Sequence, residues 1–180
     1  MSTPHYFIAI EISPFVKEKI EAQKNAWQEI LPFKQWTHKQ DVHITLAFLG
    51  SVKEEVLVNI QRFLKETIAS LPSVSIRINK INTFGKNESP RIFWIGPENG
   101  EELQPIYDEV QEVVHKSGMN PESRPFRPHI TLAKKWQGTK DFQQPETFVP
   151  FDMKVSSVCL YRIHPQETPK YEVVSQYRLR

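Results

Sequence analysis

The feature that most constrains the fold is an internal repeat, because the pentapeptide HITLA occurs twice in the chain. The copies cover residues 43–47 and 129–133, an offset of 86. The same offset carries Phe7 onto Phe93 and Ile20 onto Ile106, so each half reads as a strand, a helix and then a HITLA strand. A repeat in matching element order indicates duplication. We therefore expect two similar lobes related by a pseudo-twofold axis, with both copies facing one cleft.

Apolar periodicity and turn residues predict an α+β chain. We expect strands at residues 5–12, 42–49, 74–80, 91–96, 126–134, 153–163 and 171–179, and helices at 14–31, 53–70 and 101–116. Ser13 and Pro14 suit the N-cap and first turn of the first helix. Residues 137–150 are polar and proline-bearing and are typical of a surface loop. The prediction is a single two-lobed domain over residues 1–180.

Composition limits the ligands and the cellular location that this chain can have. The 180 residues include 23 Lys and Arg against 21 Asp and Glu, a formal charge of +2, which is too even for a protein that binds long stretches of nucleic-acid backbone. The single cysteine, Cys159, excludes multi-cysteine zinc sites and suits a reducing compartment. No apolar run approaches the roughly 18 residues of a membrane span. The start MSTPHYFIAIEIS lacks the features of a secretory signal, so we expect a cytoplasmic protein without membrane contact.

Strand alternation places the polar side chains of each repeat on one face. His43 and Thr45 share a face in the first copy, as His129 and Thr131 do in the second. A phosphodiester reaction needs a base for the attacking oxygen and an acid for the leaving oxygen, and two histidines can supply both near neutral pH. Threonine hydroxyls can donate to the non-bridging phosphate oxygens. The sequence therefore predicts His43 and His129 as catalytic residues and Thr45 and Thr131 as phosphate ligands, with no metal or cofactor.

The chain resembles the two-histidine phosphoesterases, and among them the RNA 2',3'-cyclic phosphodiesterases also described as 2'-5' RNA ligases. The resemblance runs nearly end to end, through the segments YFIAIEIS, HITLAFLG, SPRIFWIG, RPFRPHITLA and VCLYRIHPQETPKYEVV. It implies a bilobal α+β fold in which two antiparallel sheets line a V-shaped cleft, with helices packed outside. It also implies hydrolysis of a terminal 2',3'-cyclic phosphate to a 2'-phosphate, and 2'-5' RNA ligation as a reverse activity. His43 would give a proton to the leaving 3'-oxygen, and His129 would be the base that activates water.

Three further residues are candidates for substrate binding. Arg127 lies two positions before His129 and could hold a phosphate, or it could pair with Asp41, its counterpart under the 86-residue shift. Lys134 stands where related sequences often have arginine, so the charge is kept but flat stacking on a base is lost. Phe48 falls on the core side by strand alternation, so packing is expected there unless the strand ends or bulges.

Four readings of the site stay open. The first is a cyclic phosphodiesterase that acts on RNA 3' ends or small cyclic-phosphate nucleotides. The second is a phosphodiesterase for another small cyclic phosphate or a 2'-5' oligonucleotide, and the third is a non-catalytic RNA-end binding module. The fourth is a metal hydrolase that uses Asp41, His43 and His129, although the usual cluster of carboxylates and histidines is missing. Base preference is open, and we expect a monomer.

Overall fold

The computed structural model describes residues 3–180, and over this range the chain is an α+β protein with ten strands and three α-helices. The elements, in chain order, are β1 (His5–Glu11), α1 (Pro14–Gln28), β2 (Phe33–Trp36), β3 (His43–Ser51), α2 (Glu54–Ile68), β4 (Val74–Ile78), β5 (Lys80–Gly85), β6 (Pro90–Gly96), α3 (Gln104–Lys116), β7 (Ile130–Trp136), β8 (Phe151–Val155), β9 (Ser157–Ile163) and β10 (Tyr171–Arg178). Short 3₁₀ helices at Lys39–Asp41 and Glu101–Leu103 precede β3 and α3.

Eight strands form one antiparallel sheet in the order β10-β9-β1-β3-β7-β6-β5, with β2 paired to β7. Within residues 3–180, β3 and β7 pair at a single position, Ile44 opposite Ile130, so the sheet consists of two halves joined at one point. The remaining strands, β4 and β8, pair with each other. The expected α+β fold with antiparallel sheets is confirmed, and the two halves of the large sheet correspond to the two expected lobes.

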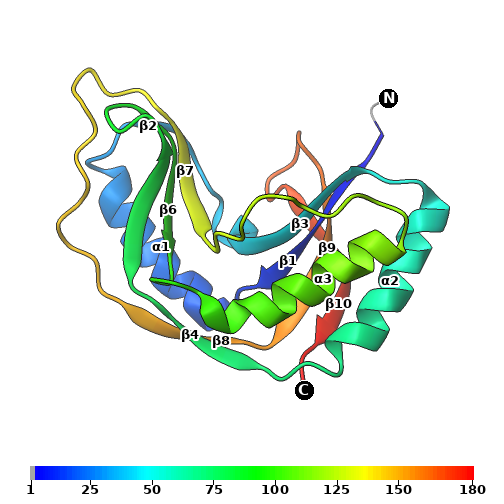
Figure 1. Cartoon of the computed structure of the whole chain (residues 1–180). Helices are drawn as coiled ribbons and strands as arrows, with labels where there is room; N and C mark the ends of the chain where they lie inside the picture. The colour runs from blue at the N-terminus through cyan, green and yellow to red at the C-terminus, as the bar shows by residue number, and fades with distance from the viewer. Residues whose placement is uncertain (1–2) are drawn as a thin grey trace.

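We call β1, β3, β9 and β10 the first lobe, and β2, β5, β6 and β7 the second lobe. Figure 1 shows the lobes as two arms of the ribbon, with β4 and β8 near their base. Strands from distant parts of the chain meet in the first lobe, where β1 lies between β3 and β9. Each lobe therefore contains segments from both halves of the sequence, which the repeat alone does not predict.

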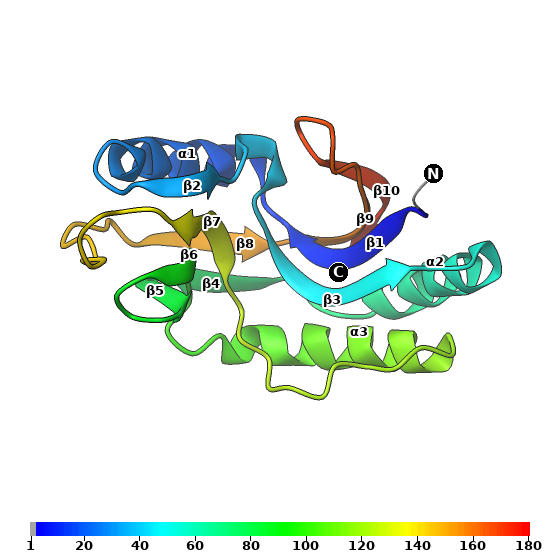
Figure 2. The ribbon, with the colours of Figure 1, turned by 90° about the horizontal axis from the view of Figure 1, so that it is seen from above.

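The helices are exchanged between the lobes. Helix α1 follows the first strand of the first lobe, yet it packs on the second lobe, where the Trp27 ring meets Phe93 of β6 at a centroid distance of 5.3 Å. Helix α3 comes from the second half of the chain and lies against β3 and α2. Figure 2 shows α1 beside β2, and α2 and α3 on the side of β3. The N-terminus of α1 forms as expected, since Ser13 accepts from the backbone N–H of Val16 at 3.3 Å and Pro14 stands in the first turn.

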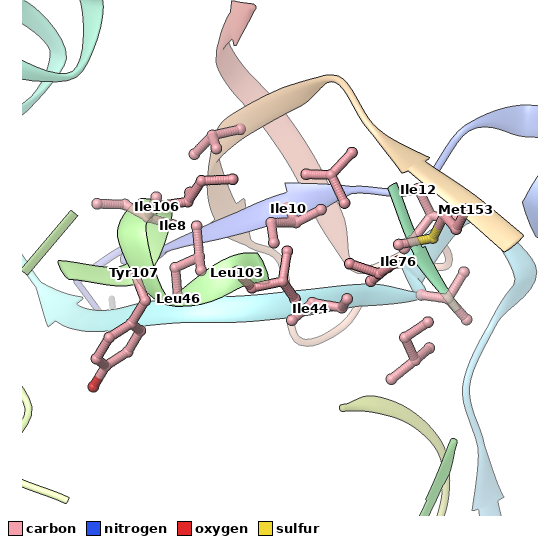
Figure 3. Close-up of a cluster of buried hydrophobic side chains, with 14 of the residues drawn as sticks. Ile8, Ile10, Ile12, Ile44, Leu46, Ile76, Leu103, Ile106, Tyr107 and Met153 are labelled. Atoms are coloured by element: carbon pink, nitrogen blue, oxygen red, sulfur yellow. The ribbon is translucent and has the colours of Figure 1, made fainter. Parts of the chain in front are cut away.

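One apolar core joins the helices to the inner face of the sheet. Ile8 and Ile10 of β1 meet Ile44 and Leu46 of β3 there, beneath Ile106 of α3 (Figure 3). These five side chains are almost completely buried. Because burial of such a side chain stabilises a fold by about 1.5–3 kcal/mol, this face of β3 is fixed, and the other face is left for polar groups.

The predicted elements differ from the structure at four places. The predicted strand 126–134 begins only at Ile130, because Pro125 and Pro128 have no N–H to donate to a neighbouring strand. The predicted strand 153–163 divides where the chain passes from pairing with β4 to pairing with β1. The predicted strand 74–80 corresponds to β4, and strand β5 was not predicted. The short strand β2 was not predicted. No regular element forms over residues 137–150, as expected for a loop.

The match of Phe7 to Phe93 under the 86-residue shift is wrong by one position. Ile8 lies opposite Ala47, and Phe93 lies opposite Ala133 in the other HITLA copy. Phe93 is therefore the structural counterpart of Ile8, and both point into the core. Phe7 lies on the opposite face, with its ring 4.8 Å from that of His43.

Candidate active site

The junction between the lobes brings the two HITLA copies together. Ile44 opposes Ile130 there, and both side chains are fully buried. The residues on either side of each isoleucine therefore point to the open face, where His43 and Thr131 line one hollow, His129 lines another, and Thr45 lines both. The structure thus assembles the four residues that the sequence singled out.

Two adjoining hollows of about 820 and about 800 Å³ form the cleft over this junction. His129 lines the first, which we call the arginine hollow because it contains Arg91, Arg124 and Arg127. His43 and Thr131 line the second, which we call the lysine hollow because Lys134 and Lys170 lie in it. Thr45 and Phe48 line both. The histidines therefore belong to different hollows that meet at shared residues, so a group held at the meeting point has one imidazole on each side.

Each imidazole is oriented by a hydrogen bond to the backbone carbonyl two residues before it. Nδ1 of His43 donates to the carbonyl of Asp41 at 2.7 Å, and Nδ1 of His129 donates to the carbonyl of Arg127 at 2.7 Å. A carbonyl can only accept, so Nδ1 carries the proton in each ring and Nε2 is the atom that can exchange one. Nε2 of neutral His43 accepts from the Thr45 hydroxyl at 3.0 Å. The carbonyl two residues before each histidine thus fixes its tautomer.

Burial makes both histidines weak bases in the free protein. It lowers the pKa of His43 from 6.5 to about 4, helped by the nearby charge of His129 and opposed by the Asp41 carbonyl. Burial also lowers the pKa of His129, against the effect of the Arg127 carbonyl. Both rings are therefore neutral at pH 7 without a ligand. An anion between them raises both pKa values, because negative charge favours the imidazolium form.

Aromatic side chains supply that burial. The ring of Tyr171 lies edge-on to His43 at 5.3 Å. On the other side of the junction, Phe84 lies edge-on to His129 at 4.9 Å, and Trp94 lies at 5.7 Å. Trp94 is nearly buried, so it supports His129 and is closed to a base. Trp36 lines the lysine hollow and stays a candidate for base contact.

A duplicated β-bulge overturns the prediction that Phe48 packs in the core. The pairing of β1 with β3 skips Leu46, and the pairing of β6 with β7 skips Leu132, the same position of the second copy. Each extra residue reverses the alternation of the side chains that follow. Phe48 is consequently 66% exposed and lines both hollows. Its counterpart Lys134 lines the lysine hollow, so both residues reach the cleft.

The alternative of an ion pair between Arg127 and Asp41 is wrong. The buried Asp41 carboxylate accepts from the backbone N–H groups of Lys170 and Tyr171, at 2.9 and 3.2 Å. Arg127 is exposed and lines the arginine hollow beside His129. The two residues are counterparts through their backbone carbonyls, which hold the two histidines, while their side chains have different partners. Arg127 therefore remains available to a ligand.

Sequence patterns missed two residues that hold the site together. The Gln111 side chain on α3 donates to the Leu46 carbonyl at 2.8 Å and accepts from the Glu122 N–H at 2.9 Å. It thereby ties the bulge in β3 to the segment that leads to His129. Lys170 follows the turn between β9 and β10 and is held by Asp41. Both contacts join residues distant in sequence, and no local motif marks them.

The metal-hydrolase reading finds no support in these contacts, because the Asp41 carboxylate is directed at backbone N–H groups and not toward the histidines. No three His, Cys, Asp or Glu residues within 3–180 are grouped so that they could hold a metal ion. Over the same residues, none of the helices has the length and apolar character needed to cross a membrane.

The fold and the paired His-x-Thr motifs define a bilobal protein of the two-histidine class. A family profile described as the 2'-5' RNA ligase superfamily matches residues 16–167. The crystal structure of LigT from E. coli complexed with 3'-AMP superimposes with a TM-score of 0.83, at 20% identity over 99% of each chain. The chain belongs to the 2'-5' RNA ligase superfamily, and the resemblance read from its motifs is confirmed.

Two curated relatives are named RNA 2',3'-cyclic phosphodiesterase. The protein from Bacillus subtilis (strain 168) is 34% identical over 98% of this chain and 97% of its own length. The protein from Geobacillus stearothermophilus is 36% identical over 99% of this chain, which spans 58% of the length of that relative. The chain is thus similar along nearly its whole length to proteins named as cyclic phosphodiesterases.

Proposed function

We propose that this protein is an RNA 2',3'-cyclic phosphodiesterase that uses His43 and His129 as its acid and base. The observation that carries the proposal is the junction of β3 and β7, where both His-x-Thr pairs face the same cleft. The family supports the reaction class, and the relatives named as RNA 2',3'-cyclic phosphodiesterases support the substrate.

In the proposed reaction, the cyclic phosphate lies where the two hollows meet. Nε2 of His129 takes a proton from water, the water oxygen forms a bond to phosphorus, and the bond from phosphorus to the 3'-oxygen breaks. Nε2–H of protonated His43 gives its proton to that 3'-oxygen. The product carries a 2'-phosphate and a 3'-hydroxyl. Thr45 and Thr131 donate hydrogen bonds to the non-bridging oxygens, and neither step uses a metal ion.

The substrate supplies the condition under which His43 holds a proton. Burial lowers the pKa of His43 to about 4 in the free protein, and the negative phosphodiester beside it raises that value. Substrate binding therefore favours the protonated form of His43 that the proposed acid requires, and the empty cleft favours the neutral form. The same geometry allows 2'-5' ligation, in which the 5'-hydroxyl of a second RNA end replaces the water beside His129.

Product analysis tests the reaction class. An RNA oligomer that ends in a 2',3'-cyclic phosphate is incubated with the protein in a strong chelator, and ³¹P NMR identifies the product. A terminal 2'-phosphate is expected. A 3'-phosphate would contradict the assigned leaving group, and turnover that returns only with a divalent ion would contradict metal independence. Tight binding without turnover would favour the RNA-end binding module.

The division of roles between the histidines has its own test. A substrate with sulfur in place of the bridging 3'-oxygen has a leaving group that needs no proton. We expect this substrate to restore the rate of His43→Ala toward that of the unaltered protein and to leave His129→Ala slow. Rescue of His129→Ala alone would reverse the two roles.

Two lesser parts of the proposal follow from the same site. Both histidines come from one chain, so we propose that a monomer is active; gel filtration of the active species tests this. We also propose that the protein acts in the cytoplasm, consistent with its single, reduced cysteine.

A further inference from the structure

The lysine hollow extends past the place of the reacting phosphate. Besides His43 and Thr131, its lining includes Trp36, Lys170 and Lys134, which stands three residues beyond Thr131 on β7. Its volume of about 800 Å³ lies within the roughly 300–1,000 Å³ typical of small-molecule sites. A cyclic phosphate at the junction occupies one end. The hollow therefore has room for a nucleoside and for a group beyond it.

The two lysines come from opposite lobes. Lys134 stands on β7 of the second lobe and reaches the cleft because of the bulge at Leu132. Lys170 precedes β10 of the first lobe, where the Asp41 carboxylate holds its backbone N–H at 2.9 Å. The charge of Lys170 contributes to lowering the pKa of Lys134, after the larger effect of burial. The two side chains thus line one hollow from opposite lobes.

Acidic side chains nearby do not neutralise this pair. Glu21, in the same hollow, is bound to Lys24 at 2.7 Å, and the Asp41 oxygens accept from backbone N–H groups. Among residues 3–180, neither Lys134 nor Lys170 has a carboxylate within ion-pair distance. Two uncompensated positive charges held toward one hollow are the arrangement expected for an anion site.

We propose that Lys134 and Lys170 bind a second phosphate, the one on the 5'-oxygen of the terminal nucleoside, while its cyclic phosphate lies between the histidines. In an RNA this group is the last internucleotide phosphodiester, and in a nucleotide it is a 5'-phosphate. The inference rests on the proposed function and refines its substrate class, because it predicts that a nucleoside 2',3'-cyclic phosphate alone is an incomplete substrate.

Three substrates and two variants test the site. The substrates are adenosine 2',3'-cyclic phosphate, its 5'-phosphorylated form, and the dinucleotide ApA that ends in a cyclic phosphate. Lys134→Met and Lys170→Met remove charge at similar length. Lys135→Met is the matched control, since Lys135 is exposed, neighbours Lys134 and lines neither hollow.

We expect KM to be lower for both substrates with a 5'-linked phosphate than for adenosine 2',3'-cyclic phosphate. Each lysine variant should raise KM for those two substrates by about tenfold, the lower end for a hydrogen bond to a charged group, with kcat nearly unchanged. The slope of log KM against log salt for the dinucleotide should fall by about 0.7 for each lysine removed. Lys135→Met should leave all three KM values as they are.

Equal KM values for the three substrates, or an equal rise for all three in the lysine variants, would overturn the site. Improvement for the 5'-phosphorylated nucleotide alone would assign the site to a terminal phosphate, and improvement for the dinucleotide alone would assign it to the RNA backbone. If no substrate is hydrolysed, the proposed function is wrong, but binding measured by calorimetry still tests the phosphate site at Lys134 and Lys170. Adenosine 2',5'-bisphosphate should then bind more tightly than adenosine 2'-phosphate, and Lys170→Met should abolish that difference; equal affinities would reject the site.

Discussion

The neutral, buried state of His43 makes the stability of the protein depend on pH in a way that one substitution can isolate. The pKa of His43 is about 4 in the folded protein, against a normal value of 6.5. Between these two values the unfolded chain binds a proton at this position and the folded chain does not. Protonation therefore favours unfolding, and the contribution of His43 is present above pH 6.5 and is lost as the pH falls toward 4.

The size of the effect follows from the two pKa values. Between pH 7 and pH 5, titration of His43 lowers the free energy of unfolding by about 2 kcal/mol. Burial lowers the pKa of His129 as well, so its contribution has the same sign. His43→Gln removes one titrating group and leaves the rest, including His129 and the Glu11 carboxylate, whose pKa is also lowered.

Urea unfolding of both proteins at pH 7 and pH 5 measures the difference. The unaltered protein should lose about 2 kcal/mol more than His43→Gln over this interval. Inorganic phosphate should reduce the loss, since an anion between the histidines raises the pKa of His43. Equal pH dependence of the two proteins would refute the burial of a neutral imidazole at this position.

Three other outcomes follow from contacts around the cleft. Phe48→Ala should raise KM for RNA ends roughly tenfold if the exposed ring stacks on a base, and the urea midpoint should stay the same. An unchanged KM would show that Phe48 does not contribute to substrate binding. Gln111→Met should lower the free energy of unfolding by about 1–3 kcal/mol, because the Leu46 carbonyl and the Glu122 N–H lose their partner, and a loss no greater than that of Gln104→Met on the exposed face of α3 would show that the contact is dispensable. Burial raises the pKa of the Cys159 thiol to about 12, so iodoacetamide at pH 8 should label it only in urea, and rapid labelling of the folded protein would contradict that burial.

The residues at the centre of the site could be predicted because their signal is local and repeated. Ile44 and Ile130 must enter the core, and period-two alternation then forces the neighbouring histidines and threonines onto the other face. The helices were predictable for a similar reason, since their buried residues recur every three or four positions.

The rest of the cleft depends on contacts that the sequence does not record locally. The bulges at Leu46 and Leu132 reverse the alternation of side chains between the two faces of the sheet. No glycine or proline at these positions indicates a bulge, so the prediction that Phe48 packs in the core was wrong. The Asp41 carboxylate binds a segment about 130 positions away, and such a partner is set by tertiary packing. The packing of α1 on the second lobe and of α3 on the first could not be predicted either. An apolar helix face indicates that the helix is buried, but it does not indicate which strands the helix packs against.

In the proposed mechanism, two imidazoles act as one acid–base pair on a single phosphorus atom. The decisive measurement is single-turnover hydrolysis of an RNA oligomer ending in a 2',3'-cyclic phosphate by His43→Ala, His129→Ala and the double variant. Each single substitution should slow the reaction by roughly a hundredfold to ten-thousandfold in a folded protein, and the double variant should be little slower than the worse single one. An undiminished rate in either single variant, or fully multiplied losses in the double variant, would contradict it.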